Sequence, residues 1–360
     1  MKCPVGSKMK QIRNYLFVAA AMALSLFACK VNTNNNTTDD KTSNHAVGKN
    51  GKTPFKTLNY LYSISGNKTV TGIHNREPNA TPVRWTEEIY KTTGKYPGLW
   101  SGDFLFQQEN IANRQVMIAE ALKQWQKGAI VNLMWHACNP ANTQPCEWDN
   151  GKGVLSTLTD AQWQELITDG APINLRWKAM LDEVAAHLQV LEDNSVEVLW
   201  RPLHEMNQGK FWWGGRPGAN GTRKLYQLTH AYLTKTKGLT NLIWVWDMQD
   251  FPTLATDLNT YNPGEAYWDV AALDVYDASG FTVEKYNAMV NISGGKPIAI
   301  GECDKYPTVA QLQAQPKWVF FMGWSELVYE KNKPEELQAL FNATQNISLD
   351  ELPGWQKAIN

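Results

Sequence analysis

Eight short apolar runs alternate with stretches of helical periodicity along this chain of 360 residues. Two of the runs, residues 130–135 and 242–246, are almost continuously apolar. Strands of this composition are buried on both faces, which favours parallel pairing. The eight expected strands are residues 69–76, 96–104, 129–138, 196–205, 241–248, 268–277, 297–304 and 318–326.

Helical spacing of apolar residues is clearest at 115–127, 173–191 and 223–237. Strand and helix repeated eight times predict an α/β fold, a (β/α)8 TIM barrel, as a single domain over residues 53–360. An insertion at 139–170, with little strong pattern, separates the third and fourth strands. An open doubly wound sheet is the alternative. No glycine-rich G-x-G-x-x-G follows any expected strand, which disfavours its nucleotide-binding versions.

The first 29 residues have the pattern of a bacterial export signal, with a basic start and an apolar stretch at 15–28. The stretch ends in Leu-Phe-Ala before Cys29, which resembles a lipobox, and simple cleavage is the alternative. Residues 30–52 are polar and predict a flexible tether. We therefore expect an exported lipoprotein, attached to the outer membrane through Cys29 on its periplasmic or cell-surface side.

Charge and cysteine usage exclude several classes of protein. The 34 basic and 35 acidic side chains give a net charge of −1, which argues against a nucleic-acid-binding protein. The five cysteines form no C-x-x-C pair, and no H-E-x-x-H motif is present, so we expect no metal and no cofactor. Cys138 and Cys146 are expected to form a local disulfide that shapes the insertion, whereas Cys303 is expected to point into packing.

Active sites of (β/α)8 barrels lie at the C-terminal ends of the strands. Polar and aromatic residues end five of the expected strands, and a carboxylate directly after a buried run is costly unless it has partners or a function. The residues at these ends are His136, Glu205, Tyr276, Glu302 and Trp324.

Glu205 and Glu302 end the fourth and seventh strands, which face each other across the barrel mouth. Two glutamates in this arrangement suit glycoside hydrolysis, in which one carboxyl is protonated and the other is ionised. The alternative is that each glutamate is an ion-paired residue of the rim. The accompanying His204, Tyr276 and Trp324 favour the catalytic interpretation.

Two segments resemble motifs of glycoside hydrolase family 26, a family of clan A retaining glycosidases. Residues 201–207 (RPLHEMN) with 211–213 (FWW) resemble its acid/base motif, and residues 298–302 (IAIGE) resemble its nucleophile strand. The segments 71–74 (TGIH) and 323–324 (GW) also fit, and the resemblance runs from about Thr53 to the C-terminus.

The resemblance implies a retaining enzyme in which Glu205 is the acid/base and Glu302 the nucleophile. It also implies a mannan endo-1,4-β-mannosidase acting on mannan, galactomannan or glucomannan. Endo cleavage and release of mannobiose remain open, as do the β-1,3-xylanase and mixed-linkage β-glucanase activities found in the family. A surface lipoprotein that binds glycan without cutting it is the non-catalytic alternative. We expect a monomer that binds a polysaccharide or oligosaccharide.

The resemblance further implies a set of residues around the two glutamates. His204 would bind the sugar in the −1 subsite, Tyr276 would donate its phenol to Glu302, and Trp324 would stack on a pyranose. Additional candidates are His136, Arg201, Asp269, Asp274 and the sugar platforms Trp212 and Trp213. The alternatives are that His136 is a core histidine, that Arg201 belongs to a buried ion pair, and that Asp274 only braces its neighbours.

Two positions depart from the family pattern. Lys210 stands where many members place an aromatic residue that supports the +1 sugar. Ser325 stands where some relatives have a basic residue that grips a distal sugar.

Overall fold

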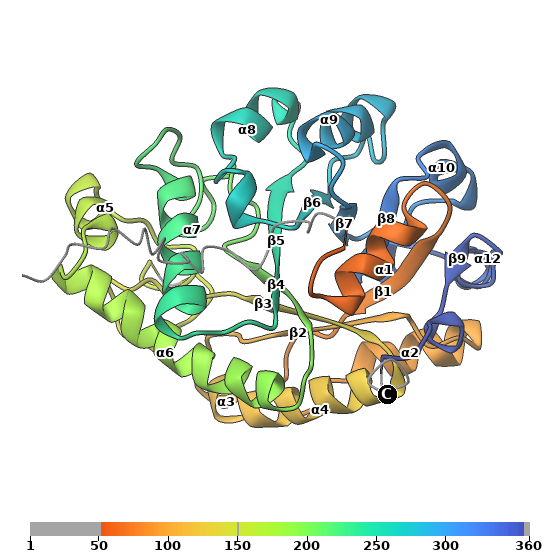
Figure 1. Ribbon diagram of the computed structural model, residues 1–360, viewed down its shortest axis with the longest axis horizontal. Coiled ribbons are helices and arrows are strands. Elements are labelled where there is room, and N and C mark those ends of the chain that lie inside the picture. Colours follow the sequence, from red (N-terminus) through yellow and green to blue (C-terminus); the bar gives the residue numbers. More distant parts are fainter. Residues whose placement is uncertain (1–51, 150, 356–360) are drawn as a thin grey trace, which may run out of the picture. The chain divides into compact units, whose positions relative to one another are not determined.

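Eight parallel strands close on themselves in the computed structural model, which describes residues 52–149 and 151–355 (Figure 1). The strands follow the order β2-β3-β4-β5-β6-β7-β8-β1, and β1 pairs with β2 to complete the ring. This closure confirms the (β/α)8 barrel and excludes the open doubly wound sheet. The predicted leader at 1–29 and all but the last residue of the predicted tether at 30–52 lie outside the described residues.

Each predicted strand run matches one barrel strand, with β5 extending one residue beyond its run, and the strand residues are buried along their whole length except at Trp324. Burial on both faces explains why the runs are apolar rather than alternating. The strands are β1 (Thr69–His74), β2 (Leu99–Asp103), β3 (Ile130–Trp135), β4 (Val198–Pro202), β5 (Leu242–Gln249), β6 (Val270–Val275), β7 (Ile298–Cys303), β8 (Trp318–Trp324) and the short β9 (Asn346–Ile347), which pairs with β1.

The three predicted helices are confirmed as α4, α6, and α7 with the π-helical turn η1 that extends it. Helix α4 is capped by Gly128, whose φ of 99° is the left-handed conformation that glycine adopts without strain. The helices are α1 (Lys56–Ile64), α2 (Arg84–Thr93), α3 (Gln108–Ala112), α4 (Arg114–Lys127), α5 (Asp160–Ile167), α6 (Pro172–Asp193), α7 (Thr222–Ala231), η1 (Tyr232–Thr236), α8 (Leu254–Thr260), η2 (Glu265–Tyr267), α9 (Val283–Ser293), α10 (Val309–Ala314), α11 (Leu327–Lys331), α12 (Pro334–Phe341) and η3 (Leu349–Glu351).

The insertion between β3 and α6 contains helix α5, which the sequence pattern did not reveal. Eight residues are too few for a clear period of 3.6. A capping box nonetheless marks its start, because Thr159 and Gln162 each accept a hydrogen bond from the other's backbone. The predicted disulfide between Cys138 and Cys146 is present at the base of this insertion.

Replacing both Cys138 and Cys146 by serine should lower the free energy of unfolding by about 2 kcal/mol, because the bond constrains the unfolded chain. Urea unfolding of the oxidised protein and of the double variant checks this. Treating the natural protein with a reductant should move its midpoint to that of the variant. A variant as stable as the oxidised protein would contradict the expectation.

Tryptophan side chains fill much of the space between the barrel and its helices. Trp135 on β3 stacks on Trp177 of α6 with ring centroids 5.0 Å apart. Trp200, Trp244 and Trp246 are fully buried on β4 and β5. Trp135, Trp200, Trp244 and Trp246 therefore pack the barrel from within its strands. Within 52–149 and 151–355, no helix has the length and apolar character needed to cross a membrane.

Candidate active site

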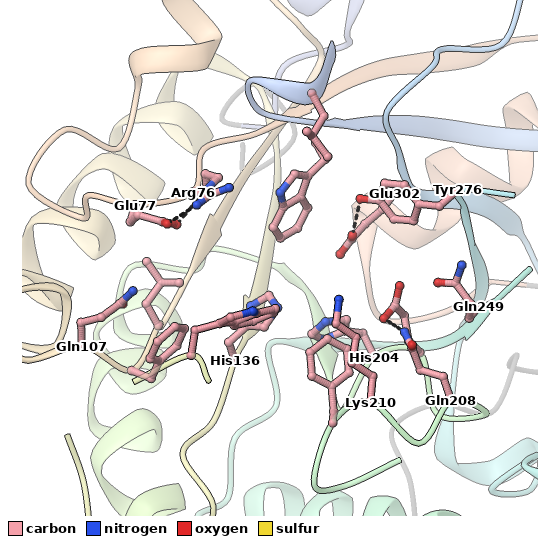
Figure 2. A pocket seen from close by; sticks show the side chains of 17 residues that line it. Arg76, Glu77, Gln107, His136, His204, Gln208, Lys210, Gln249, Tyr276 and Glu302 are labelled. Carbon is pink, nitrogen blue, oxygen red and sulfur yellow. Dashed lines mark hydrogen bonds and ion pairs between the residues drawn. The ribbon is translucent and has the colours of Figure 1, made fainter. Parts of the chain in front are cut away.

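A cleft of about 640 Å³ opens at the C-terminal ends of the barrel strands (Figure 2). Six of the predicted site residues line it, and they come from β3, β4, β6, β7 and β8 or from the residues that follow them. They are His136, His204, Glu205, Tyr276, Glu302 and Trp324.

The two predicted catalytic glutamates meet in this cleft. One carboxylate oxygen of Glu205 and one of Glu302 lie within 4.8 Å of each other. Both residues are buried, with 6% and 4% of their surface exposed. Burial raises the pKa of Glu205 well above its usual range, and the carboxylates of Glu302 and Asp247 add to the rise. Glu205 is therefore suited to hold a proton near neutral pH.

Glu302 has partners that favour its ionised form. Burial raises its pKa as well, but the Arg201 guanidinium and the Tyr276 hydroxyl oppose this rise. Arg201 is 1% exposed and donates from Nη2 to Glu302 Oε1. The Tyr276 hydroxyl donates to Glu302 Oε2 at 2.8 Å. The environments of the two glutamates therefore push them towards different protonation states.

Arg201 is shared among three buried carboxylates. Its Nη1 donates to Asp247 Oδ2 at 2.6 Å and to Asp274 Oδ2 at 2.9 Å. Burial raises the pKa of Asp274 well above its usual range, and Arg201 counters that rise. Arg201 and Asp274 therefore lie beneath the cleft, where they orient Glu302 rather than line the surface.

Gly301 leaves room for this carboxylate cluster. A Cβ atom at position 301 would lie 2.6 Å from Asp274 Oδ1 and 2.8 Å from Asp247 Oδ1, closer than such atoms pack. The residue directly before the proposed nucleophile therefore has to be glycine for the two aspartates to reach Arg201.

His136 is oriented by Asp103, which ends β2. Its Nδ1 bonds to Asp103 Oδ2, and its backbone N–H donates to Asp103 Oδ1 at 3.1 Å. An ionised carboxylate only accepts, so Nδ1 donates in this bond. His136 lines the cleft, so its Nε2 is available to a ligand hydroxyl.

Trp324 presents one face of its indole ring to the cleft because His74 covers the other. The two rings stack with centroids 4.3 Å apart and an interplanar angle of 21°. Burial lowers the pKa of His74 to about 3, so this ring is neutral. An indole supported in this way is a suitable platform for the apolar face of a sugar.

His204 is also neutral. Burial lowers its pKa well below the usual range, and the nearby His136 lowers it further. The rings of His204 and His136 meet edge to face with centroids 4.5 Å apart. His204 Nδ1 has no hydrogen-bond partner among the described residues, which leaves one buried polar atom of the site unsatisfied.

Two residues near Glu205 hold unusual backbone conformations. Leu203 has a φ of 54° and Glu205 a φ of 51°, in the left-handed region that non-glycine residues adopt at a cost of about 1 kcal/mol each. The Glu205 N–H donates to Asp247 Oδ2 at 3.2 Å, and the Trp213 indole donates to the His204 carbonyl at 2.9 Å. These bonds hold the strained turn that aims Glu205 into the cleft.

Besides Arg201 and Asp274, three predicted binding residues do not line the cleft. Trp212 and Trp213 are 2% and 0% exposed, and Phe211 lines the cleft from the same run of aromatics. Their indoles donate to backbone carbonyls and pack the loop, so their faces are not open to a sugar. Asp269 lies at the start of β6, far from its C-terminal end, and accepts from the Trp244 N–H at 2.8 Å.

Several residues that line the cleft or support it from beneath were not predicted. Trp148, in the insertion, is 38% exposed, and Lys210 Nζ lies 5.4 Å from the centre of its ring. Asp103 and Asp247 support the site from β2 and β5, and Gln208 contacts Glu205. The position of Asp247 within the expected strand 241–248 was the one available signal for it.

A (β/α)8 barrel with two buried glutamates after β4 and on β7 has the architecture of the barrel-type glycoside hydrolases. The chain belongs to glycosyl hydrolase family 26, whose family model matches residues 47–351. This confirms the resemblance that the sequence motifs carried.

Curated relatives include a mannan endo-1,4-beta-mannosidase of Thermothelomyces thermophilus, 32% identical over 82% of this chain and 61% of its own length. The mannan endo-1,4-beta-mannosidase A and B of Caldalkalibacillus mannanilyticus is 29% identical over 79% of this chain and 58% of its own length. The chain thus spans about three fifths of these two relatives.

Solved structures give the same placement. The structure of GH26A from a Muricauda species is 34% identical, with a TM-score of 0.76, covering 82% of this chain and 95% of that one. A beta-mannanase from a symbiotic protist of the termite Reticulitermes speratus, complexed with gluco-manno-oligosaccharide, is 26% identical, with a TM-score of 0.72, covering 82% and 93%.

Proposed function

We propose that the protein is a retaining mannan endo-1,4-β-mannosidase that cleaves β-1,4-mannosidic linkages in mannan, galactomannan or glucomannan. The observation that carries the mechanism is the approach of Glu205 and Glu302, whose oxygens lie within 4.8 Å. Retaining enzymes hold their carboxyl groups about 5–5.5 Å apart, whereas inverting enzymes leave room for a water. The names of the curated relatives support the choice of mannan.

The two glutamates act in two steps. Ionised Glu302 attacks the anomeric carbon while Glu205 gives its proton to the glycosidic oxygen, so the bond to the leaving sugar breaks and a glycosyl-enzyme ester forms. Ionised Glu205 then takes a proton from water, whose oxygen attacks the anomeric carbon and releases Glu302. Each residue thereby returns to its starting protonation state.

The sugar at the cleavage point has partners on two sides. Trp324 supplies the stacking face, and His136 Nε2 accepts from a hydroxyl group because Asp103 holds the Nδ1 proton. His204 is adjacent to the acid/base and neutral, which suits it to hydrogen-bond an uncharged sugar. These roles are part of the proposal.

Replacing Tyr276 by phenylalanine should move the acid limb of the pH profile of kcat/KM to higher pH. The Tyr276 hydroxyl lowers the pKa of Glu302, so its removal raises that pKa, and the nucleophile is ionised over a narrower range. We expect kcat/KM near neutral pH to fall about tenfold, the equivalent of one lost hydrogen bond to a charged group. An acid limb that stays in place would contradict this role.

We further propose that the leader and tether export the protein and attach it to the outer membrane through Cys29. The disulfide between Cys138 and Cys146 supports export, because such bonds persist in oxidising compartments.

A panel of glycans with product analysis tests the proposed function. We expect hydrolysis of β-1,4-mannan, galactomannan or glucomannan, with the β-anomer seen first by NMR. Initial release of the α-anomer would contradict the retaining mechanism. Cleavage of β-1,3-xylan or mixed-linkage β-glucan alone would favour the other family activities, and glycan binding without new reducing ends would favour a non-catalytic lipoprotein. The lengths of the products distinguish endo cleavage from mannobiose release.

A further inference from the structure

We propose that Gln208 is a positioning residue that anchors one oxygen of the acid/base Glu205, so that the other oxygen exchanges the proton with the substrate. This inference rests on the proposed function of Glu205 and adds a residue to it. Gln208 lies three residues after Glu205, on the loop that follows β4, and it lines the cleft.

The contact is direct. Gln208 Nε2 donates a hydrogen bond to Glu205 Oε2, as the dashed line at Gln208 shows (Figure 2). Among the described residues, this is the one side-chain hydrogen bond to the Glu205 carboxylate. Glu302, by contrast, has side-chain donors on both of its oxygens. Glu205 Oε2 is thus held by a side-chain donor, whereas Glu205 Oε1 has no side-chain donor among the described residues.

The backbone at Gln208 is held in place by Gly214 and Gly215, where the loop after β4 folds back on itself. A Cβ atom at Gly214 would lie 2.2 Å from the Gln208 carbonyl oxygen, and one at Gly215 would lie 2.7 Å from Gly209 Cα. The Gly215 N–H also donates to the Met206 carbonyl at 3.0 Å. These approaches are possible only without side chains, so the loop closes tightly and keeps Gln208 in place.

The residue before Gln208 is anchored as well. Asn207 Nδ2 donates to the Gln249 carbonyl at 2.9 Å, and Asn207 Oδ1 accepts from the Gln249 N–H at 2.8 Å. This pair of bonds ties the loop to the end of β5. Gln208 therefore contacts Glu205 from a fixed position, rather than as a freely moving surface side chain.

The chemistry of an amide donor decides which oxygen carries the proton. A carboxylic acid has a carbonyl oxygen and an O–H group, and an amide N–H prefers the carbonyl oxygen because it is the stronger acceptor. With Oε2 taken by Gln208, the proton of Glu205 resides on Oε1. In the first step Oε1 gives this proton to the glycosidic oxygen, and in the second step Oε1 receives a proton from water.

The same bond opposes the effect of burial. Burial raises the pKa of Glu205, whereas a hydrogen bond donated to a carboxylate favours the ionised form. Removing the donor should therefore raise the pKa of the acid/base further. Since the first step needs protonated Glu205, the basic limb of the kcat/KM profile should move to higher pH.

The test replaces Gln208 by methionine, which is similar in length and has no donor. We compare kcat/KM on a mannooligosaccharide with that on dinitrophenyl β-mannobioside, whose leaving group departs without a proton. We expect a loss of about tenfold on the oligosaccharide, a part of the 10²–10⁴-fold that general acid catalysis contributes, and less than a twofold change on the aryl glycoside. The basic limb should move to higher pH.

The matched control is Gln164→Met at an exposed position of α5. It removes the hydrogen bond that the Gln164 side-chain amide donates to the Thr168 hydroxyl. Equal losses on both substrates, or a basic limb that does not move, would overturn the role of Gln208. Gln208→Ala repeats the test if the methionine variant unfolds at lower urea than the control. Glu205→Ala separates the two proposals, because activity on the oligosaccharide in that variant would overturn the assignment of Glu205 itself.

Discussion

Replacing Glu302 by alanine is expected to abolish hydrolysis of mannan while glycan binding persists. Loss of a nucleophile typically lowers kcat by a factor on the order of 10⁵–10⁶, because the covalent step has no substitute. The cleft keeps its other lining residues in this variant, including Trp324 and His136. Release of reducing ends measures activity, and isothermal titration with mannooligosaccharides measures binding.

Two additional measurements make the result specific to Glu302. A small anionic nucleophile such as azide should restore cleavage of an activated aryl mannobioside and yield the α-glycosyl azide, because the removed side chain leaves room beside the anomeric carbon. Glu165→Ala, at an exposed position of α5, is the control and should retain full activity. Unchanged hydrolysis in Glu302→Ala would disprove the mechanism.

Replacing Arg201 by methionine is expected to lower the free energy of unfolding by about 3–5 kcal/mol, because a buried ion cluster loses its cation. Three carboxylates share this guanidinium, and Arg201 and its two aspartates are almost completely buried. Without Arg201 these groups have to take up protons or be buried as unpaired charges. Urea unfolding of the variant at neutral pH measures the loss.

The pH dependence of the Arg201 variant has a definite sign. A carboxyl whose pKa is raised by folding stabilises the folded state below its unfolded pKa, and this contribution is lost as pH rises through the folded pKa. Asp274 already has a raised pKa, and Arg201 is the group that counters it. The variant should therefore lose more stability between acidic and neutral pH than the natural protein.

A second substitution tests the cause. Arg201→Met combined with Asp247→Asn removes one of the carboxylates and should recover part of the lost stability. A single variant that unfolds at the same urea concentration as the natural protein would contradict the interpretation of Arg201 as the essential counter-charge.

The sequence was sufficient to predict the barrel and its two glutamates, for a physical reason. Parallel strands buried on both faces leave continuous apolar runs, and a carboxylate directly after such a run stands out. Glu205 and Glu302 both follow this rule. Asp247 lies inside β5, as Glu302 lies inside β7, and Asp103 ends β2. Nothing local in the sequence shows that Asp247 contacts Arg201 or that Asp103 contacts His136.

The loop after β4 was predicted less well. Three consecutive aromatics, Phe211, Trp212 and Trp213, lie in irregular backbone, where no period indicates which side chain faces the cleft. The structure turns Phe211 inward and buries both tryptophans. The role of Gln208 depends on the tight return of the loop at Gly214 and Gly215, which is a tertiary property.

Gly301 has a consequence for how the tolerance of this chain to mutation is interpreted. It has no functional group, yet any side chain there would collide with the carboxylates of Asp247 and Asp274. Substitution at position 301 would thus displace the aspartates that hold Arg201 beneath the cleft, without contacting the glycan. A saturation-mutagenesis map of β7 scored by activity alone would group Gly301 with Glu302, and only a parallel stability map would separate the residue that makes space from the one that reacts.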